Sequence, residues 1–374
     1  MTTSHPPLAR SAGSLRTSVF AKLAERIKAF GSDFLPLHIG DTYRLPPEAA
    51  RLEKVDASSP SFYKYAHPHG HGELLEALGH KLKTQNRIPA GTDSIQVANG
   101  ATQALSAAIA TVLDPEDEVL VLSPFWPLIT GVMQSNRVKP VQIPYGFDLE
   151  PYLTEKTRAV YFANPNNPDG RVATLQELEQ LAAQASKHDL WVIADEVYED
   201  YVFDGREHVS IASLSGMHER TLTAYSFSKS YALAGARVGY VVAHPEVMDP
   251  LRRVANHQVY NVSQAMQLCA LGALQHGHDW LRESQTLYEQ ARKALHAGLQ
   301  GRCPLSQGGA YLFLELESEQ AMWSLLERAL ERGLGLAPGE AFGQAHKHCL
   351  RICYTAAPLE GIEKGARILT ELLG

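Results

Sequence analysis

Six short apolar segments separated by helical stretches, between about residues 93 and 244, constrain the fold of this chain more than any other feature. They are, in order, Ser94–Ala98, Glu118–Leu122, Ala159–Ala163, Leu190–Ala194, Thr221–Tyr225 and Val238–Ala243. Each is apolar at nearly every position, which is typical of parallel strands covered on both faces. Helices are predicted between them at Ala101–Leu113 and Thr174–Lys187, the second opening with a capping box of Thr174 and Glu177. The alternation predicts a three-layer α/β/α domain with a mostly parallel sheet.

The pattern changes after Ser263, where helices and strands no longer alternate regularly. The predicted elements are a long helical stretch to about Leu299, a strand within GGAYLFLEL (308–316), a helix at Glu319–Arg332, a strand at His348–Tyr354 and a terminal helix. This order indicates a second, smaller α+β unit.

The first forty residues are too few to form a domain of their own. They contain a predicted helix near Val19–Phe30, followed by the apolar segment FLPLHIG. We expect them to complete the smaller unit. The predicted division is therefore a large domain over residues 45–262 and a small domain built from residues 1–44 and 263–374.

Charge and composition exclude several partners and compartments. The net charge is −7 and the basic residues are scattered, so neither nucleic acid nor an anionic membrane is an expected partner. No apolar run approaches the ~18 residues of a membrane helix, and the N-terminus lacks the apolar stretch of a signal peptide. The four cysteines, Cys269, Cys303, Cys349 and Cys353, fit reduced thiols in a cytoplasmic protein.

His67, His69 and His71 alternate in a way that invites a metal-site hypothesis. No acidic or cysteine cluster accompanies them, so we predict no metal site. Two nucleotide-binding signatures are also missing. No G-x-G-x-x-G follows a strand, and the P-loop sequence is absent, which disfavours an NAD or ATP enzyme.

A turn with the sequence Asn99-Gly100-Ala101-Thr102 lies between the first apolar run and the first helix. Free backbone N–H groups and the helix dipole favour an anion at such a position, and glycine lets a phosphate approach the backbone. A glycine turn is also ordinary between a strand and a helix. The turn alone leaves both interpretations open.

Two ionisable residues follow later strands, at the sheet edge where ligands bind in open α/β folds. Asp195 comes directly after the fourth run and needs a cationic or strongly donating partner, such as a pyridinium nitrogen, unless it is a helix cap or a surface residue. Lys229 lies among small and hydroxylated residues, where an amine can lose its proton and form an imine with an aldehyde. Ser226, Ser228 and Arg237 are suitable donors to a phosphate.

The segment from Ser226 to Tyr240, SFSKSYALAGARVGY, resembles the lysine signature of the class I and II aminotransferases, which use pyridoxal 5'-phosphate (PLP) and share the aspartate-aminotransferase fold (fold type I). The resemblance implies that Lys229 binds PLP as a Schiff base. It also implies that Ser226 and Arg237, three residues before and eight after the lysine, bind the cofactor phosphate, with Ser228 contacting it as well.

Further motifs of this family follow in order over nearly the whole chain, from about residue 18 to the terminal helix. The resemblance implies that Tyr65, in YAHPHGHGEL, reaches the cofactor phosphate of a partner subunit. Gly100, Ala101 and Thr102 would form the phosphate turn, and Trp126, in PFWP, would stack on the pyridine ring.

Four more motifs complete the series. Asn167, in NPNNPDG, and Tyr198 resemble the two donors to the 3′ oxygen of the cofactor, and Asp195 resembles the partner of its pyridinium nitrogen. Arg351 resembles the arginine that binds the substrate α-carboxylate, and Gly40 resembles a glycine that borders it.

The resemblance implies a PLP-dependent aminotransferase that exchanges the amino group between an L-amino acid and a 2-keto acid, as a homodimer with shared active sites. A lyase, synthase, decarboxylase or oxidase of the same fold reuses the same cofactor residues, so these alternatives stay open. A non-catalytic ligand sensor of this fold usually carries a fused DNA-binding domain, for which this chain has neither room nor a basic helix. The residues that select the substrate side chain are not identified from the sequence.

Overall fold

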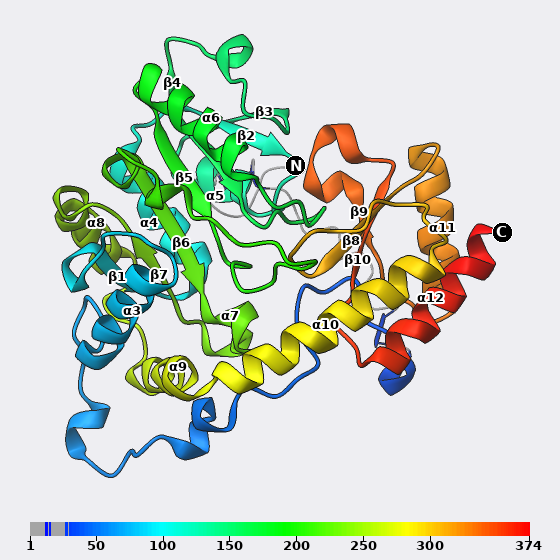
Figure 1. The fold of residues 1–374 in the computed structure, drawn as a ribbon, viewed down its shortest axis with the longest axis horizontal. Helices are drawn as coiled ribbons and strands as arrows, with labels where there is room; N and C mark the ends of the chain where they lie inside the picture. Colours follow the sequence, from blue (N-terminus) through cyan, green and yellow to red (C-terminus); the bar gives the residue numbers. More distant parts are fainter. Residues whose placement is uncertain (1–11, 14, 16–26, 29) are drawn as a thin grey trace, which may run out of the picture.

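The larger of two sheets dominates the computed structural model, which describes residues 12–13, 15, 27–28 and 30–374 (Figure 1). Its strands are β1 (Ile95–Ala98), β2 (Glu118–Ser123), β3 (Lys139–Pro144), β4 (Thr157–Ala163), β5 (Trp191–Asp195), β6 (Thr221–Ser226) and β7 (Gly239–Val242). They lie in the order β1-β7-β6-β5-β4-β2-β3. Within this sheet β7 is antiparallel to both of its neighbours, and the other pairs are parallel. The predicted mostly parallel sheet is confirmed.

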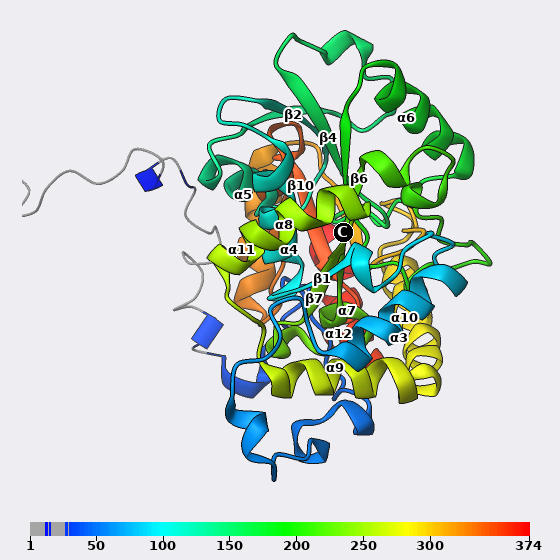
Figure 2. The same cartoon turned by 90° about the vertical axis from the view of Figure 1, so that its left-hand side faces the viewer.

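Helices cover both faces of this sheet, as Figures 1 and 2 show from two sides. One face packs on α4 (Gly100–Val112), α5 (Ile129–Ser135) and α8 (Pro245–Gln258), and the other on α3 (Gly72–Thr84), α6 (Leu175–Lys187) and α9 (Gln264–His276). The side chains of consecutive strand residues point to opposite faces of the sheet. Tyr161 and Ile193 pack in the apolar core under α4, whereas Val160 and Val192 pack in the core under α6. This explains why the strands are apolar at nearly every position. The predicted capping box is present, with Thr174 as the N-cap of α6 and Glu177 bonded back to it.

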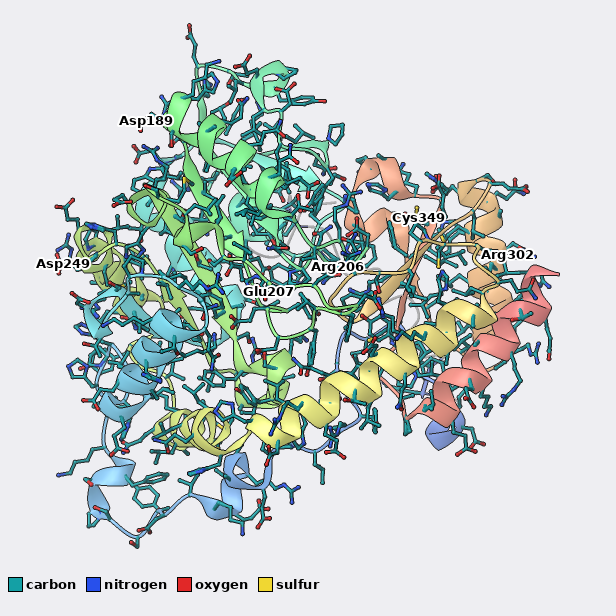
Figure 3. All side chains as sticks on the ribbon, in the orientation of Figure 1. Asp189, Arg206, Glu207, Asp249, Arg302 and Cys349 are labelled. Atoms are coloured by element: carbon teal, nitrogen blue, oxygen red, sulfur yellow. The ribbon has the colours of Figure 1, made fainter. Side chains whose placement is uncertain are left out.

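The smaller sheet contains three antiparallel strands in the order β8-β10-β9. They are β8 (Tyr311–Glu315), β9 (Ala337–Pro338) and β10 (Cys349–Cys353), flanked by α10 (His278–Gly298), α11 (Glu319–Glu331) and α12 (Leu359–Leu373). In Figure 1, α10 runs from the end of α9 beside the larger sheet to the smaller one. Figure 3 shows Cys349 in this smaller unit and Asp249 at the opposite end of the molecule.

Residues 35–37 lie against the smaller unit. The backbone N–H of Leu35 donates to the carbonyl of Gly333 at 2.8 Å, and the N–H of Cys353 donates to the carbonyl of Leu37 at 2.7 Å. Most of the helix predicted near Val19–Phe30 lies outside the described residues. The domain limits 45–262 and 1–44 with 263–374 remain our proposal.

Three of the differences between the observed and the predicted elements have a physical explanation. Strand β3 was not predicted, because the edge sequence KPVQIP contains two prolines and exposed polar residues and pairs only with β2. Strand β9 is only two residues long. The predicted continuous helix after Ser263 is two helices separated by Gly277, where a Cβ atom would lie 2.4 Å from the carbonyl oxygen of Ala273.

Across the part of the chain that the structure describes, no helix combines the length and apolarity needed to cross a membrane.

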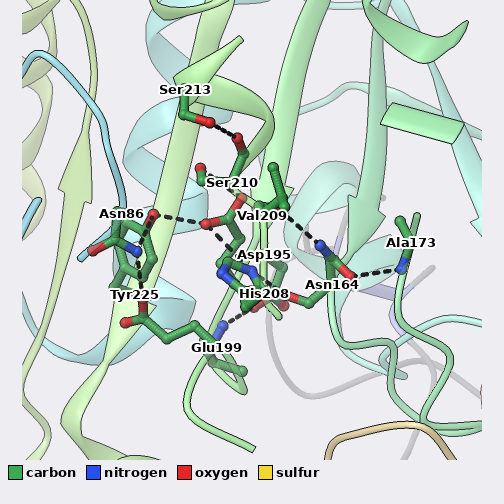
Figure 4. A network of polar contacts seen from close by, with 12 residues as sticks. Asn86, Asn164, Ala173, Asp195, Glu199, His208, Val209, Ser210, Ser213 and Tyr225 are labelled. Atoms are coloured by element: carbon green, nitrogen blue, oxygen red, sulfur yellow. Dashed lines mark hydrogen bonds and ion pairs between the residues drawn. The ribbon is translucent and has the colours of Figure 1, made fainter. Parts of the chain in front are cut away.

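A buried polar network joins the carboxyl ends of β4, β5 and β6 (Figure 4). Glu196 follows β5 and is fully buried, and its carboxylate accepts hydrogen bonds from Tyr225 Oη at 2.7 Å and Ser210 Oγ at 2.9 Å. The side chain of Asn164, just after β4, bonds Val209 on one side and Ala173 on the other. The network therefore fixes the strand ends relative to one another.

The same network continues to α3 through an ion pair. Lys81 Nζ lies 2.8 Å from Glu199 Oε1, and Asn86 Nδ2 donates to the other carboxylate oxygen of Glu199 at 2.6 Å. Burial raises the pKa of Glu196 to about 8; the hydrogen bond from Tyr225 lowers it, and the charge of Glu199 raises it further. Glu196 is thus held mainly in its neutral form at pH 7.

We expect this pKa to make stability depend on pH. The ordinary pKa of Glu196 is 4.5, so between about pH 4.5 and 8 the folded protein keeps a proton that the unfolded chain releases, and stability falls as pH rises through that window. Glu196→Gln keeps the shape of the neutral acid and does not titrate. The melting temperature of the variant, relative to the natural protein, should therefore rise between pH 5.5 and 8.5 in thermal unfolding followed by circular dichroism. A difference that stays constant over this range would contradict the assignment.

Candidate active site

One cavity of about 810 Å³ collects most of the predicted site residues. It lies at the carboxyl ends of β4, β5 and β6, next to the start of α4 and the strand β10 of the smaller sheet. The predicted residues that line it are Gly40, Ala101, Thr102, Trp126, Asn167, Asp195, Tyr198, Ser226, Ser228, Lys229, Arg237 and Arg351. Two predicted residues, Gly100 and Tyr65, are not part of its lining.

Asp195 is the last residue of β5 and is 4% exposed. Tyr161 Oη donates to its Oδ2 at 3.0 Å, and the backbone N–H of Val197 makes a long bond of 3.4 Å to Oδ1. Burial raises the pKa of Asp195 to about 6, although the hydrogen bond from Tyr161 and the charge of Lys229 act in the opposite direction. A cation placed against this carboxylate would lower that pKa and stabilise its charge.

Lys229 lies in the single turn α7 (Phe227–Ser230), directly after β6. Its Nζ donates to the carbonyl oxygen of Gly40, and Tyr201 Oη donates to its backbone carbonyl at 2.9 Å. Burial lowers the pKa of the amine, with the charge of Asp41 acting in the opposite direction. A larger fraction of this amine is therefore neutral and nucleophilic than in water.

Gly40 has no side chain, and this lets the Tyr311 ring lie directly against its backbone. A Cβ atom at this position would lie 1.9 Å from the hydroxyl oxygen of Tyr311. Any other residue would displace Tyr311 or the carbonyl that accepts from Lys229.

The start of α4 forms one end of the cavity and suits an anion. Gly100, at φ +75°, opens the helix, and a Cβ atom there would lie 2.4 Å from Arg237 Nη2, so glycine lets the guanidinium lie against the turn. Ala101, Thr102 and the hydroxyl residues Ser226 and Ser228 line the same cavity. Helix N–H groups, hydroxyls and a guanidinium together favour a phosphate.

Arg351, in β10, brings a second guanidinium to the cavity from the smaller sheet. Its Nη1 donates to Asn167 Oδ1 at 3.0 Å, its Nη2 donates to the carbonyl of His38 at 2.9 Å, and it lies 4.1 Å from the ring centroid of Tyr311. Its Nε is buried and has no partner among the described residues. The guanidinium is thus oriented and still has a donor for a carboxylate.

Three residues of the site were missed in the sequence. Tyr311 lines the cavity and lies 2.5 Å from Tyr198 through their hydroxyl oxygens, and Tyr161 bonds Asp195. Both tyrosines occur inside predicted strands, where an aromatic residue is ordinary core. His38 contributes its backbone carbonyl, for which the residue type gives no signal.

Tyr65 lies on the surface, 85% exposed, with its ring against Tyr260 at a centroid distance of 5.1 Å. Tyr63, two residues earlier in the sequence, is 77% exposed. Exposed aromatic residues of this kind are frequent where a protein partner binds. Tyr65 therefore does not contribute to the described lining of the cavity in its own chain.

Comparisons with known proteins identify the family of this chain. Residues 32–369 match the family described as aminotransferase class I and II. The chain is 33% identical to aromatic-amino-acid aminotransferase 2 of Thermococcus litoralis, over 86% of this chain and 87% of that protein. It is 31% identical to aspartate aminotransferase of Pinus pinaster, over 95% of this chain and 79% of that protein.

A solved structure shares the fold over nearly the full length. This is a double mutant of aspartate aminotransferase from Thermus thermophilus, with a TM-score of 0.89, 26% identity and coverage of 98% of this chain and 100% of that chain. The resemblance expected from the motifs is confirmed. The chain belongs to the class I and II aminotransferases and is a transaminase with the aspartate-aminotransferase fold.

Proposed function

We propose that this cavity exchanges an amino group between an L-amino acid and a 2-keto acid, with PLP held between the α4 turn and Asp195. The observation that carries the proposal is the shared cavity of three groups: the half-buried amine of Lys229, the buried carboxylate of Asp195 and the guanidinium of Arg351. Each has a different task in transamination.

The residues present fit PLP, the cofactor of this family. Asp195 is a buried carboxylate with a raised pKa, and it would hold a proton on the pyridine nitrogen. Arg237, Ser226 and Ser228, with the first turn of α4, would bind the phosphate. When bound, PLP supplies an aldehyde that condenses with amines and a ring that accepts an electron pair.

Trp126, Asn167 and Tyr198 would hold the ring itself. Trp126 lines the cavity and offers an aromatic face. Asn167 accepts from Arg351 through Oδ1, which leaves its amide N–H₂ to donate to the 3′ oxygen, and Tyr198 supplies a second hydroxyl donor. The Asn167 side chain would thus link the cofactor to the substrate-binding arginine.

Lys229 has two successive tasks. Its lowered pKa makes the amine reactive toward the aldehyde of the cofactor. The Nζ of Lys229 would also be the base that removes the proton from the substrate Cα. Arg351 binds the α-carboxylate, and Asn167 and the carbonyl of His38 hold its guanidinium in position.

We also propose that two copies of the chain form a dimer in which Tyr65 of each reaches the phosphate site of the other. The exposure of Tyr65, Tyr63 and Tyr260 supports this proposal. Such an arrangement would make the active sites shared across a two-fold axis.

The direct test of the function is a single half-reaction. PLP-loaded protein is mixed with each common L-amino acid in turn, and mass spectrometry follows the products. We expect a 2-keto acid and pyridoxamine phosphate in equal amounts. Carbon dioxide, free ammonia or hydrogen peroxide as the main product would instead indicate a decarboxylase, a lyase or an oxidase.

A second prediction concerns Arg351. Lysine cannot reproduce the planar fork of arginine, so Arg351→Lys should lower kcat/KM for amino acids by roughly a hundredfold or more. Bound PLP and the reaction with simple amines that lack a carboxylate should change little. Arg367→Lys, an exposed change on α12, is the matched control. Loss of PLP from the Arg351 variant, or an unchanged kcat/KM for amino acids, would contradict the assignment.

A further inference from the structure

One charged residue that lines the cavity has no task in the proposed reaction. The charged residues of the lining, within the part of the chain that the structure describes, are Asp195, Lys229, Arg237, Glu340 and Arg351. Glu340 differs from the other four. Its carboxylate is half-buried, and no hydrogen bond or ion pair joins it to another described residue.

The fold presents Glu340 from the same sheet as Arg351. Ala337 of β9 pairs directly with Arg351 of β10, and the chain then turns into the 3₁₀ helix η11 (Gly339–Phe342), which contains Glu340. Arg351 also lies 4.8 Å from the ring centroid of Phe342. The two charged residues therefore keep a fixed spacing even if the smaller unit shifts.

The turn that contains Glu340 is anchored to the larger sheet as well. The backbone N–H of Phe125 donates to the carbonyl of Phe342 at 3.1 Å, and the N–H of Gln344 donates to Gln142 Oε1 at 3.3 Å. Gln142 itself lines the cavity. The turn that contains Glu340 is thus bonded to the smaller sheet through Ala337 and to the larger unit through Phe342 and Gln344.

A charge balance of the occupied cavity singles out Glu340. The cofactor phosphate faces Arg237, the protonated ring nitrogen faces Asp195, and the α-carboxylate of the substrate faces Arg351. Of the two carboxylates in the described lining, Glu340 is then the one with no positive group assigned to it, and it would repel an acidic substrate side chain. A cationic side chain would complement it.

Other residues of the same cavity lining suit a long side chain with an apolar stem. Trp126, Leu128 and Tyr311 offer apolar surface, whereas Thr130 and Gln142 offer hydrogen-bonding groups. Side chains such as those of arginine and lysine combine an apolar stem with a charged end that prefers a polar or wet position. The cavity of about 810 Å³ has room for one beside the cofactor.

We propose that Glu340 is a specificity-determining residue that selects amino acids whose side chain ends in a cation. This inference rests on the proposed function, because it assigns the side-chain end of the same substrate. The substrate class is therefore a basic L-amino acid, or the corresponding basic 2-keto acid in the reverse direction.

The test compares two substrates of equal side-chain length, one with a cationic end and one with a neutral end. L-Arginine carries a guanidinium, whereas L-citrulline carries a neutral urea group in its place. Single-turnover kcat/KM is measured for both with the PLP-loaded natural protein and with Glu340→Gln, Glu340→Lys and the control Glu360→Gln. Glu360 is an exposed carboxylate on α12, so the control removes the same charge outside the cavity.

We expect the natural protein and the control to prefer arginine to citrulline by about tenfold or more. The arginine-to-citrulline ratio should fall at least about tenfold in Glu340→Gln and further in Glu340→Lys. A natural protein without this preference, or a ratio that Glu340→Gln leaves unchanged, would overturn the role of Glu340 while leaving transamination intact. A protein that transaminates no amino acid would overturn the proposed function, and this inference with it.

Discussion

The buried carboxylate of Asp195 is the constraint on which the rest of the site depends. It lies at the end of a strand whose other residues are apolar, and burial raises its pKa to about 6 even though the hydrogen bond from Tyr161 and the charge of Lys229 lower it. Such a group is stable in its charged form only with strong donors or a cation beside it. Tyr161 supplies one donor from β4, and the network behind Glu196 fixes the strand ends from the other side. Asp195 lines the cavity, where a protonated ring nitrogen would supply the cation that stabilises the charged carboxylate.

The charged residues of the cavity come from two different sheets. The larger sheet and α4 supply the phosphate end and Asp195, whereas the smaller sheet supplies Arg351 and Glu340. Lys229 lies between the two, with its amine bonded to Gly40 of the N-terminal segment. In the proposed reaction, a substrate held by the smaller sheet and a cofactor held by the larger one would therefore meet at Lys229.

Much of the fold could be predicted because the sheet is covered on both faces, so its strands are continuous apolar runs. The same logic located the cavity, since polar residues after parallel strands gather at one edge, as Asp195 and Lys229 do. Strand β3 could not be predicted because an edge strand can contain prolines and polar residues, and the break at Gly277 depends on a close approach to Ala273. Tyr161 and Tyr311 act from inside strands where an aromatic residue is ordinary core, and the role of Tyr65 depends on a second copy of the chain.

The most direct test of the account is the identity of the lysine that binds PLP. Borohydride reduces a lysine–PLP linkage to a stable amine, and peptide mapping then locates the label. The account predicts the label on Lys229 and its loss in Lys229→Ala. Lys81 is the informative alternative, because it is buried more fully than Lys229 but is paired with Glu199, which raises its pKa and keeps it charged. A label on Lys81 or any other lysine in the natural protein would contradict the account.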